Sequence, residues 1–154
     1  MNGNALPFDS TEMNDIMAYI KWLSTGVPTG TNIAGCGFEE IDISLVAHRK
    51  HGEVVYAAQC ASCHGVAGQG THNPQSGYVI PPLWGNDSFN DGAGMARVYT
   101  AAAFVKHNMP LGQGGKLSAQ EAVDVASFFT RQPRPDYAAK TNDWPKGDRP
   151  KDSR

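Results

Sequence analysis

The chain has 154 residues and a formal net charge of −2, enough for one ordinary domain with an extension or two very small ones. This charge, without a basic stripe, gives no support to a nucleic-acid partner, and no apolar run is long enough for membrane insertion. A hydrophobic content of 40% with 17 glycines and 10 prolines predicts a loop-rich fold whose core is completed by something other than side chains.

The first expected element is a helix from Ser10 to about Gly26, because apolar residues recur there at helical spacing. Asp9 or Ser10 can cap its start, and Gly26 and Pro28 end it. Residues 27–43 are rich in glycine and threonine and have little periodicity, which is typical of a linker.

A second helix is expected from Leu45 or Arg49 into the sequence CASCH at residues 60–64. The long stretch after it is rich in asparagine, glycine and proline and therefore predicts a loop. A loop of this length inside a compact domain is usually functional, and wrapping a cofactor is a physical reason for it.

Two more helices are expected after this loop. The third covers about Met95 to Lys106, and the fourth follows Ser118, which forms an S-x-x-E capping box with Glu121. Residues 133–154 are charged and rich in proline, so we expect an extended tail. No strand stands out, and the predicted class is all-α.

The sequence CASCH combines two thiols and an imidazole in a pattern that is typical of c-type haem attachment. Cys60 and Cys63 lie one helical turn apart, the spacing needed to form thioethers with both vinyl groups of a porphyrin. His64 follows directly, so the same turn can deliver the proximal iron ligand. The motif therefore predicts one covalently bound haem c.

Two other interpretations of the cysteines remain open. A redox-active dithiol of the thioredoxin type would need a strand before Cys60, and none is predicted. A structural zinc ion would need further ligands. Cys36 or His72 could be recruited, although neither belongs to a recognisable ligand pair.

The distal iron ligand has three candidates, which are Met95, His107 and Met109. We favour Met109 because it follows the third helix, and Pro110 biases its backbone toward an extended conformation. A thioether opposite an imidazole favours Fe(II) and raises the reduction potential. Met95 lies at helical spacing and is typical of core packing.

The sequence also predicts the surroundings of the haem. The ring nitrogen of His64 that faces away from the iron needs an acceptor, and we expect the carbonyl group of Pro81 to provide it. The predicted apolar wall of the haem pocket consists of Tyr78, Leu83, Trp84, Tyr99 and Phe104.

An internal similarity links the two ends of the chain. Met109 precedes Ser118 and a helix, just as Met1 precedes Ser10 and a helix at the same separation. We therefore expect residues 1–26 to be the last loop and helix of a preceding domain of the same kind.

Residues 44–132 resemble a class I cytochrome c. Gly52 lies eight residues before the first cysteine of C-x-x-C-H, a P-x-L-x-G sequence spans residues 81–85, and a methionine precedes a closing helix. The resemblance implies helices around one haem, with the closing helix crossing at Gly52 and Phe128 packed there.

Residues 81–115 and 143–154 further resemble the second haem domain of the dihaem thiosulfate dehydrogenase family. Those periplasmic enzymes couple two thiosulfates into tetrathionate, or catalyse the reverse reaction. Residues 1–26 resemble the end of that family's first domain, which holds the substrate site. Cys36 does not match the cysteine ligand there and is assigned no catalytic role, and Asn108 stands where some members have lysine.

These observations predict four segments: a remnant at 1–26, a linker at 27–43, a cytochrome domain at 44–132 and a tail at 133–154. The expected function is electron transfer by a His/Met-ligated haem, without substrate chemistry. The alternative is the electron-exit half of a thiosulfate dehydrogenase.

The resemblance implies a periplasmic location, although no secretory signal is visible. Expected partners are redox proteins such as cytochromes, an oxidase or a reaction centre, and a first haem domain.

Overall fold

The computed structural model describes residues 6–31 and 39–153. It divides into two compact units, Met1–Cys36 and Gly37–Arg154. Within these described residues, none of the helices has the length and hydrophobicity of a membrane span. Cys36 lies outside the described residues.

The first unit contains one helix, α1 (Thr11–Leu23), in its described part. Ser10 caps it, because the Ser10 hydroxyl group accepts a hydrogen bond from the backbone N–H of Met13 at 3.2 Å. Apolar side chains remain exposed on α1, including Ile20 at 55% and Trp22 at 67%.

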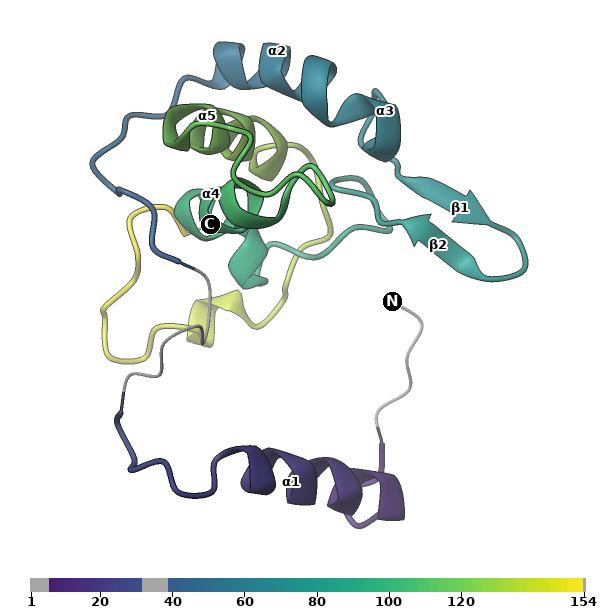
Figure 1. Ribbon diagram of the computed structural model, residues 1–154, viewed down its shortest axis with the longest axis vertical. Coiled ribbons are helices and arrows are strands. Elements are labelled where there is room, and N and C mark those ends of the chain that lie inside the picture. Colours follow the sequence, from purple (N-terminus) through teal and green to yellow (C-terminus); the bar gives the residue numbers. More distant parts are fainter. Residues whose placement is uncertain (1–5, 32–38, 154) are drawn as a thin grey trace. The chain divides into compact units, whose positions relative to one another are not determined.

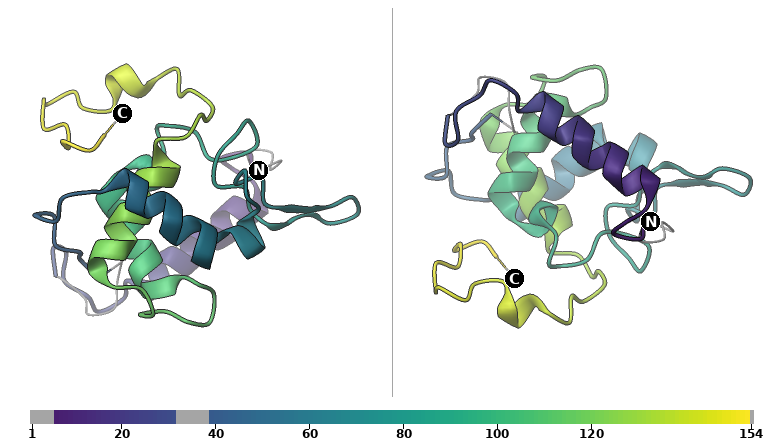
Figure 2. Two further views of the ribbon diagram at one scale, coloured as in Figure 1. Left: turned by 90° about the horizontal axis from the view of Figure 1, so that it is seen from above. Right: turned by 90° about the horizontal axis from the view of Figure 1, so that it is seen from below.

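The second unit is built on α2 (Arg49–Gln59), α4 (Val98–Asn108) and α5 (Ala119–Thr130). Helix α5 packs against both α2 and α4 and lies between them (Figures 1 and 2). Among the described residues of this unit, the short helices α3 (Ala61–His64), η1 (Gly94–Ala96) and η2 (Lys140–Asn142) are also present. The predicted all-α cytochrome c fold is confirmed.

The boundaries of two helices differ from the prediction. The helix expected to run into CASCH stops at Gln59, directly before the motif, and a separate helix, α3 (Ala61–His64), follows Cys60. The helix expected from Met95 starts at Val98, because Arg97 has an extended backbone (φ −89°, ψ 133°). The capping box of Ser118 and Glu121 is confirmed at the start of α5.

The sequence predicted no strand, and this prediction is wrong. β1 (Thr71–Asn73) and β2 (Gly77–Ile80) form an antiparallel hairpin inside the long loop, which projects away from the helices (Figure 1). The Asn73 side chain closes the turn by accepting from the N–H of Gln75 at 2.8 Å. Such short strands without a buried face leave no periodic pattern in the sequence.

Helices α2 and α5 approach each other most closely at Gly52. A Cβ atom at Gly52 would overlap the backbone carbonyl group of Asp124, so only glycine allows this spacing. The nearest atoms of α5 at Gly52 belong to Asp124 and Val125, and Phe128 lies one turn further along α5 than Asp124. The Phe128 ring lies 5.4 Å from that of Tyr56 and is tilted by 45° to it.

The core of the second unit consists mostly of small side chains. Alanines and valines from α4 and α5 dominate it, and its largest fully buried side chains are Val123, Val125, Thr130 and Asp124. Larger apolar residues stay only partly buried at its margin, namely Leu45, Leu83, Trp84, Phe89, Met95, Tyr99, Met109 and Phe128. The helices alone therefore leave a broad apolar margin incompletely covered.

Candidate haem site

The CASCH segment is held at the end of α2 by backbone hydrogen bonds. The N–H of Cys60 donates to Tyr56 at 2.9 Å, and the N–H of His64 donates to Cys60 at 2.9 Å. The Tyr56 hydroxyl group donates to the Gly65 carbonyl oxygen at 2.7 Å. Tyr56 thus ties the residue after His64 back to α2, so the two cysteines and the histidine share one rigid turn.

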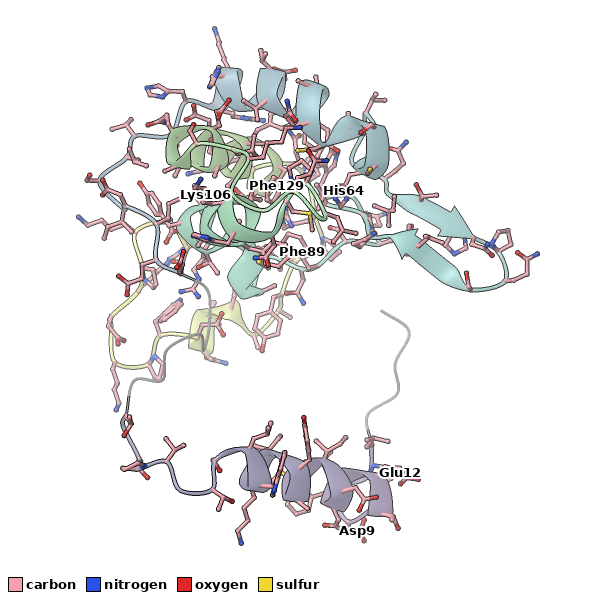
Figure 3. All side chains as sticks on the ribbon, viewed as in Figure 1. Asp9, Glu12, His64, Phe89, Lys106 and Phe129 are labelled. Carbon is pink, nitrogen blue, oxygen red and sulfur yellow. The ribbon has the colours of Figure 1, made fainter. Side chains whose placement is uncertain are left out.

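His64 is oriented by the loop that follows the hairpin (Figure 3). Its Nδ1 atom lies 2.9 Å from the carbonyl oxygen of Pro81. Because that oxygen can only accept, Nδ1 carries the proton and Nε2 keeps a lone pair for a ligand. The Leu83 N–H donates to Gly68 at 2.8 Å, which fastens the Pro81 segment beneath α3.

Met109 lies at the end of α4 with an extended backbone (φ −122°, ψ 148°), as its position before Pro110 predicts. It is partly buried against the core. Lys106 anchors the following loop, since its Nζ atom donates to Leu117 at 2.6 Å and its carbonyl oxygen accepts from Gly115 at 2.8 Å. The backbone around Met109 is therefore restrained on both sides.

The other candidate distal ligands have different surroundings. Nδ1 of His107 lies 3.0 Å from Glu39 Oε2, so this imidazole already pairs with a carboxylate. Met95 lies in η1, partly buried against the core.

The five predicted wall residues do not share one environment. Leu83 and Tyr99 lie at the margin of the core. Trp84 lies there too, and its ring is 5.0 Å from that of Tyr56. Tyr78 is on the hairpin, 40% exposed, and its hydroxyl group donates to Asp87 at 2.9 Å. Phe104 is partly buried on α4.

Sequence reasoning did not identify Tyr56 and Phe89 as parts of the site. Tyr56 lies four residues before Cys60, so helical spacing places both on one face and was the available signal. Phe89 lies in the loop and packs at the core margin. No periodic pattern marks it.

The Cys60 thiol does not have the chemistry of a redox-active dithiol. Burial, and to a lesser extent the nearby Cys63, raise the pKa of Cys60 to about 11. Redox-active dithiols have lowered pKa values instead. For zinc, the described residues contain no group of three or more His, Cys, Asp or Glu side chains placed to hold a metal ion.

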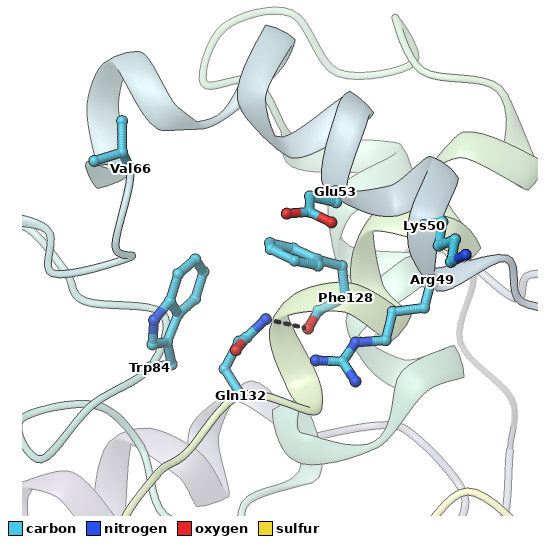
Figure 4. Close-up of a pocket in the computed structure, with 7 residues that line it drawn as sticks. All are labelled: Arg49, Lys50, Glu53, Val66, Trp84, Phe128 and Gln132. Atoms are coloured by element: carbon cyan, nitrogen blue, oxygen red, sulfur yellow. Dashed lines mark hydrogen bonds between the residues drawn. The ribbon is translucent and has the colours of Figure 1, made fainter.

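A cleft of about 530 Å³ lies beside α2 and the end of α5. Trp84 and Phe128 form its apolar side and Arg49, Lys50 and Glu53 line its rim (Figure 4). It contains none of the cysteines, His64 or Met109, so we do not assign it to the haem.

The chain's own residues fit a covalent haem. The small-residue core, the apolar margin and the free ligand nitrogen of His64 are what a large planar apolar group would need. Free thiols at Cys60 and Cys63 complete the set.

The family model described as "Cytochrome C oxidase, cbb3-type, subunit III" matches residues 47–129. The chain belongs to this family of c-type cytochromes. It carries a covalently bound c-type haem and transfers electrons. The matched region starts just before α2 and ends within α5, so it contains every predicted attachment and ligand residue.

The similarity to known proteins extends beyond residues 47–129. A thiosulfate dehydrogenase of Psychrobacter arcticus is 51% identical over all of this chain and 47% of its own length. One from Allochromatium vinosum is 47% identical over 93% of this chain and 53% of its own length. The chain thus spans about half the length of these curated relatives.

A solved structure supports the same likeness. The thiosulfate dehydrogenase of Marichromatium purpuratum matches with a TM-score of 0.76 and 40% identity, covering 88% of this chain and 29% of that one. The resemblance to the second haem domain of that family is therefore shown.

Proposed function

We propose that Cys60 and Cys63 form the two thioether bonds to the haem and that His64 and Met109 are its iron ligands. The observation that carries this proposal is the 2.9 Å contact between His64 Nδ1 and the Pro81 carbonyl oxygen. It orients the imidazole at the end of the cysteine-bearing turn and leaves Nε2 as the ligating atom.

Bound in this way, a c-type haem supplies a one-electron Fe(III)/Fe(II) couple. The protein residues do the rest. Pro81 fixes the proton on Nδ1 of His64, and the soft thioether of Met109 favours the reduced state. Leu83 and Tyr99 exclude water from the apolar margin, which also favours the state of lower charge.

We propose that this domain serves as the electron-exit half of a thiosulfate dehydrogenase. The relatives named thiosulfate dehydrogenase match the whole chain, including segments on both sides of residues 47–129. Substrate oxidation then takes place at another haem domain, and this domain passes single electrons to a redox protein in the periplasm. A free-standing electron carrier is the simpler form of the same function.

Haem attachment is tested by expression with the haem-maturation machinery and by pyridine haemochrome analysis. We expect one c-type haem per chain, and none covalently bound after Cys60→Ser with Cys63→Ser. Cys36→Ser is the matched control and should keep the haem. Retention of covalent haem by the double variant would refute the attachment proposal.

The enzyme role is tested by reading the DNA upstream of Met1 and assaying the protein that it encodes. A reading frame continuing into another C-x-x-C-H motif should yield a protein that reduces an electron acceptor with thiosulfate. A stop codon directly before Met1, with no thiosulfate activity, would leave the carrier function alone.

A further inference from the structure

The C-terminal segment 133–153 returns to the loop that leads into α4. Two backbone hydrogen bonds join the segment and the loop: Gly85 N–H donates to Pro133 at 2.8 Å, and Asp91 N–H donates to Pro135 at 3.0 Å. These bonds join residues far apart in the sequence through their backbones, so they do not depend on which side chains are present.

Asp91 strengthens this attachment with its side chain. The Asp91 carboxylate is only 10% exposed, and it accepts from the backbone N–H of Tyr137 at 2.7 Å and from Lys140 Nζ at 2.8 Å. The hydrogen bond from Lys140 is the largest cause that lowers the pKa of Asp91. A Cβ atom at Gly92 would overlap the Tyr137 ring, so the segment lies directly on the loop.

Arg134 attaches the same segment to the core margin. Its guanidinium group lies 4.2 Å from the centre of the Phe89 ring, a distance typical of a cation–π contact. Nη2 of Arg134 donates to the carbonyl oxygen of Phe129 at 2.7 Å. Arg134 thereby links Phe89 to the end of α5.

The far end of the segment supplies a cap for α4. The Tyr99 N–H donates to Oδ2 of Asp152 at 3.0 Å, whereas the N-cap residue Arg97 makes no side-chain capping bond. A carboxylate at this position also interacts favourably with the helix dipole. Tyr99 in turn donates from its hydroxyl group to Leu45 at 2.9 Å, so its ring is fixed at both ends.

We propose that residues 133–153 form a strap that positions segment 85–99, with Asp152 of the strap and Asp91 of the held segment as the positioning residues. The strap holds Phe89 and Tyr99 at the apolar margin and fixes the start of α4, whose other end carries Met109. Its function is to keep water out of the haem environment and so to maintain a high reduction potential. This inference rests on the proposed haem site.

The test compares haem-loaded Asp152→Ala with Asp148→Ala, which removes an exposed aspartate of the same strap. Loss of a helix cap should speed amide hydrogen exchange at Tyr99 roughly five- to tenfold. The reduction potential should fall, because water that enters stabilises the more highly charged Fe(III) state. Asp148→Ala should change neither quantity. Asp152→Asn keeps an acceptor oxygen and should restore most of the protection and the potential.

Asp91→Ala tests the attachment of the strap to the loop through Asp91. We expect faster amide hydrogen exchange at Tyr137 and a lower reduction potential. Faster exchange with an unchanged potential in both alanine variants would overturn the positioning role. The role of Asp152 would be overturned if the Tyr99 amide exchanged at the same rate in Asp152→Ala and Asp148→Ala. It would also be overturned if Asp152→Asn lost as much protection and potential as Asp152→Ala. Failure of the haem site itself is seen separately, as absence of haem from the unaltered protein.

Discussion

At the scale of single residues, Met109 and His64 are held by different means. Tertiary contact orients His64 through the carbonyl oxygen of Pro81. Met109 is placed by the local chain, because α4 ends there and Pro110 favours an extended backbone. Restraint by Lys106 on the following loop means that a smaller residue at 109 should leave the backbone in place.

We therefore expect Met109→Ala to lose the methionine–Fe(III) charge-transfer band and to lower the reduction potential, while the protein stays folded. Visible and near-infrared spectroscopy with a redox titration measures both quantities. Met95→Ala is the matched control and should keep the band. Loss of the band in the control, and not in Met109→Ala, would identify Met95 as the ligand.

At the scale of elements, the crossing of α2 and α5 organises the domain. Gly52 sets the distance between the two helices, because the backbone of Asp124 occupies the space of a side chain. About one turn further along α2, Tyr56 links this helix to Gly65, the residue that follows α3. The position of the cysteine-bearing turn relative to α5 therefore depends on this contact.

Gly52→Ala should lower the free energy of unfolding by about 1–3 kcal/mol or more, since overpacking forces the helices apart. Urea unfolding followed by circular dichroism measures the change. Gly94→Ala is the control, because a Cβ atom there meets only the Arg97 side chain and Thr100 at ordinary contact distances. Equal stability of both variants would contradict the role of Gly52.

A buried carboxylate ties the same two helices together. Asp124 is 1% exposed, and burial favours its neutral form, but hydrogen bonds outweigh burial and lower its pKa below the ordinary 3.8. They come from the backbone N–H of His48 at 2.8 Å, from His51 at 2.8 Å and from Gln120 at 2.7 Å. The folded state thus holds this proton less tightly than the unfolded state.

Asp124 therefore contributes stability above pH 3.8 that is lost as the pH falls through its lower folded-state pKa. We expect the free energy of unfolding to decrease on acidification below about pH 4. Asp124→Asn should show a smaller decrease, and Asp148→Asn should follow the unaltered protein. The same acid dependence in Asp124→Asn as in the unaltered protein would contradict this assignment.

At the scale of the whole molecule, the described part of the second unit buries few large side chains. Among the described residues, Tyr56 and Phe129 are its buried aromatic side chains, at 3% exposure each. The partly buried margin of Leu83, Met95 and Tyr99 would lose most contact with water if a large apolar group covered it. The covalent haem is thus a part of the core as well as the redox centre.

The double variant Cys60→Ser with Cys63→Ser should consequently unfold at a temperature about 10 °C or more below that of the haem-loaded protein. Calorimetry at matched protein concentration measures the difference. The Cys36→Ser variant should unfold at the same temperature as the unaltered haem-loaded protein. An unchanged melting temperature in the double variant would show that the core is complete without the haem.

The sequence alone determined the chemistry and the main helices of this protein. CASCH predicts haem attachment because two thiols and an imidazole within one turn depend only on local geometry, and helical periodicity is equally local. The capping box at Ser118 belongs to the same class of short-range signals.

Only the tertiary structure decided how those local parts meet. The close approach of Gly52 to Asp124, the contact of Arg134 with Phe89 and the cap of Tyr99 by Asp152 join residues far apart in the chain. Such contacts arise from the packing of irregular segments, which carry no periodic signal and acquire their conformation from the surfaces that they cover.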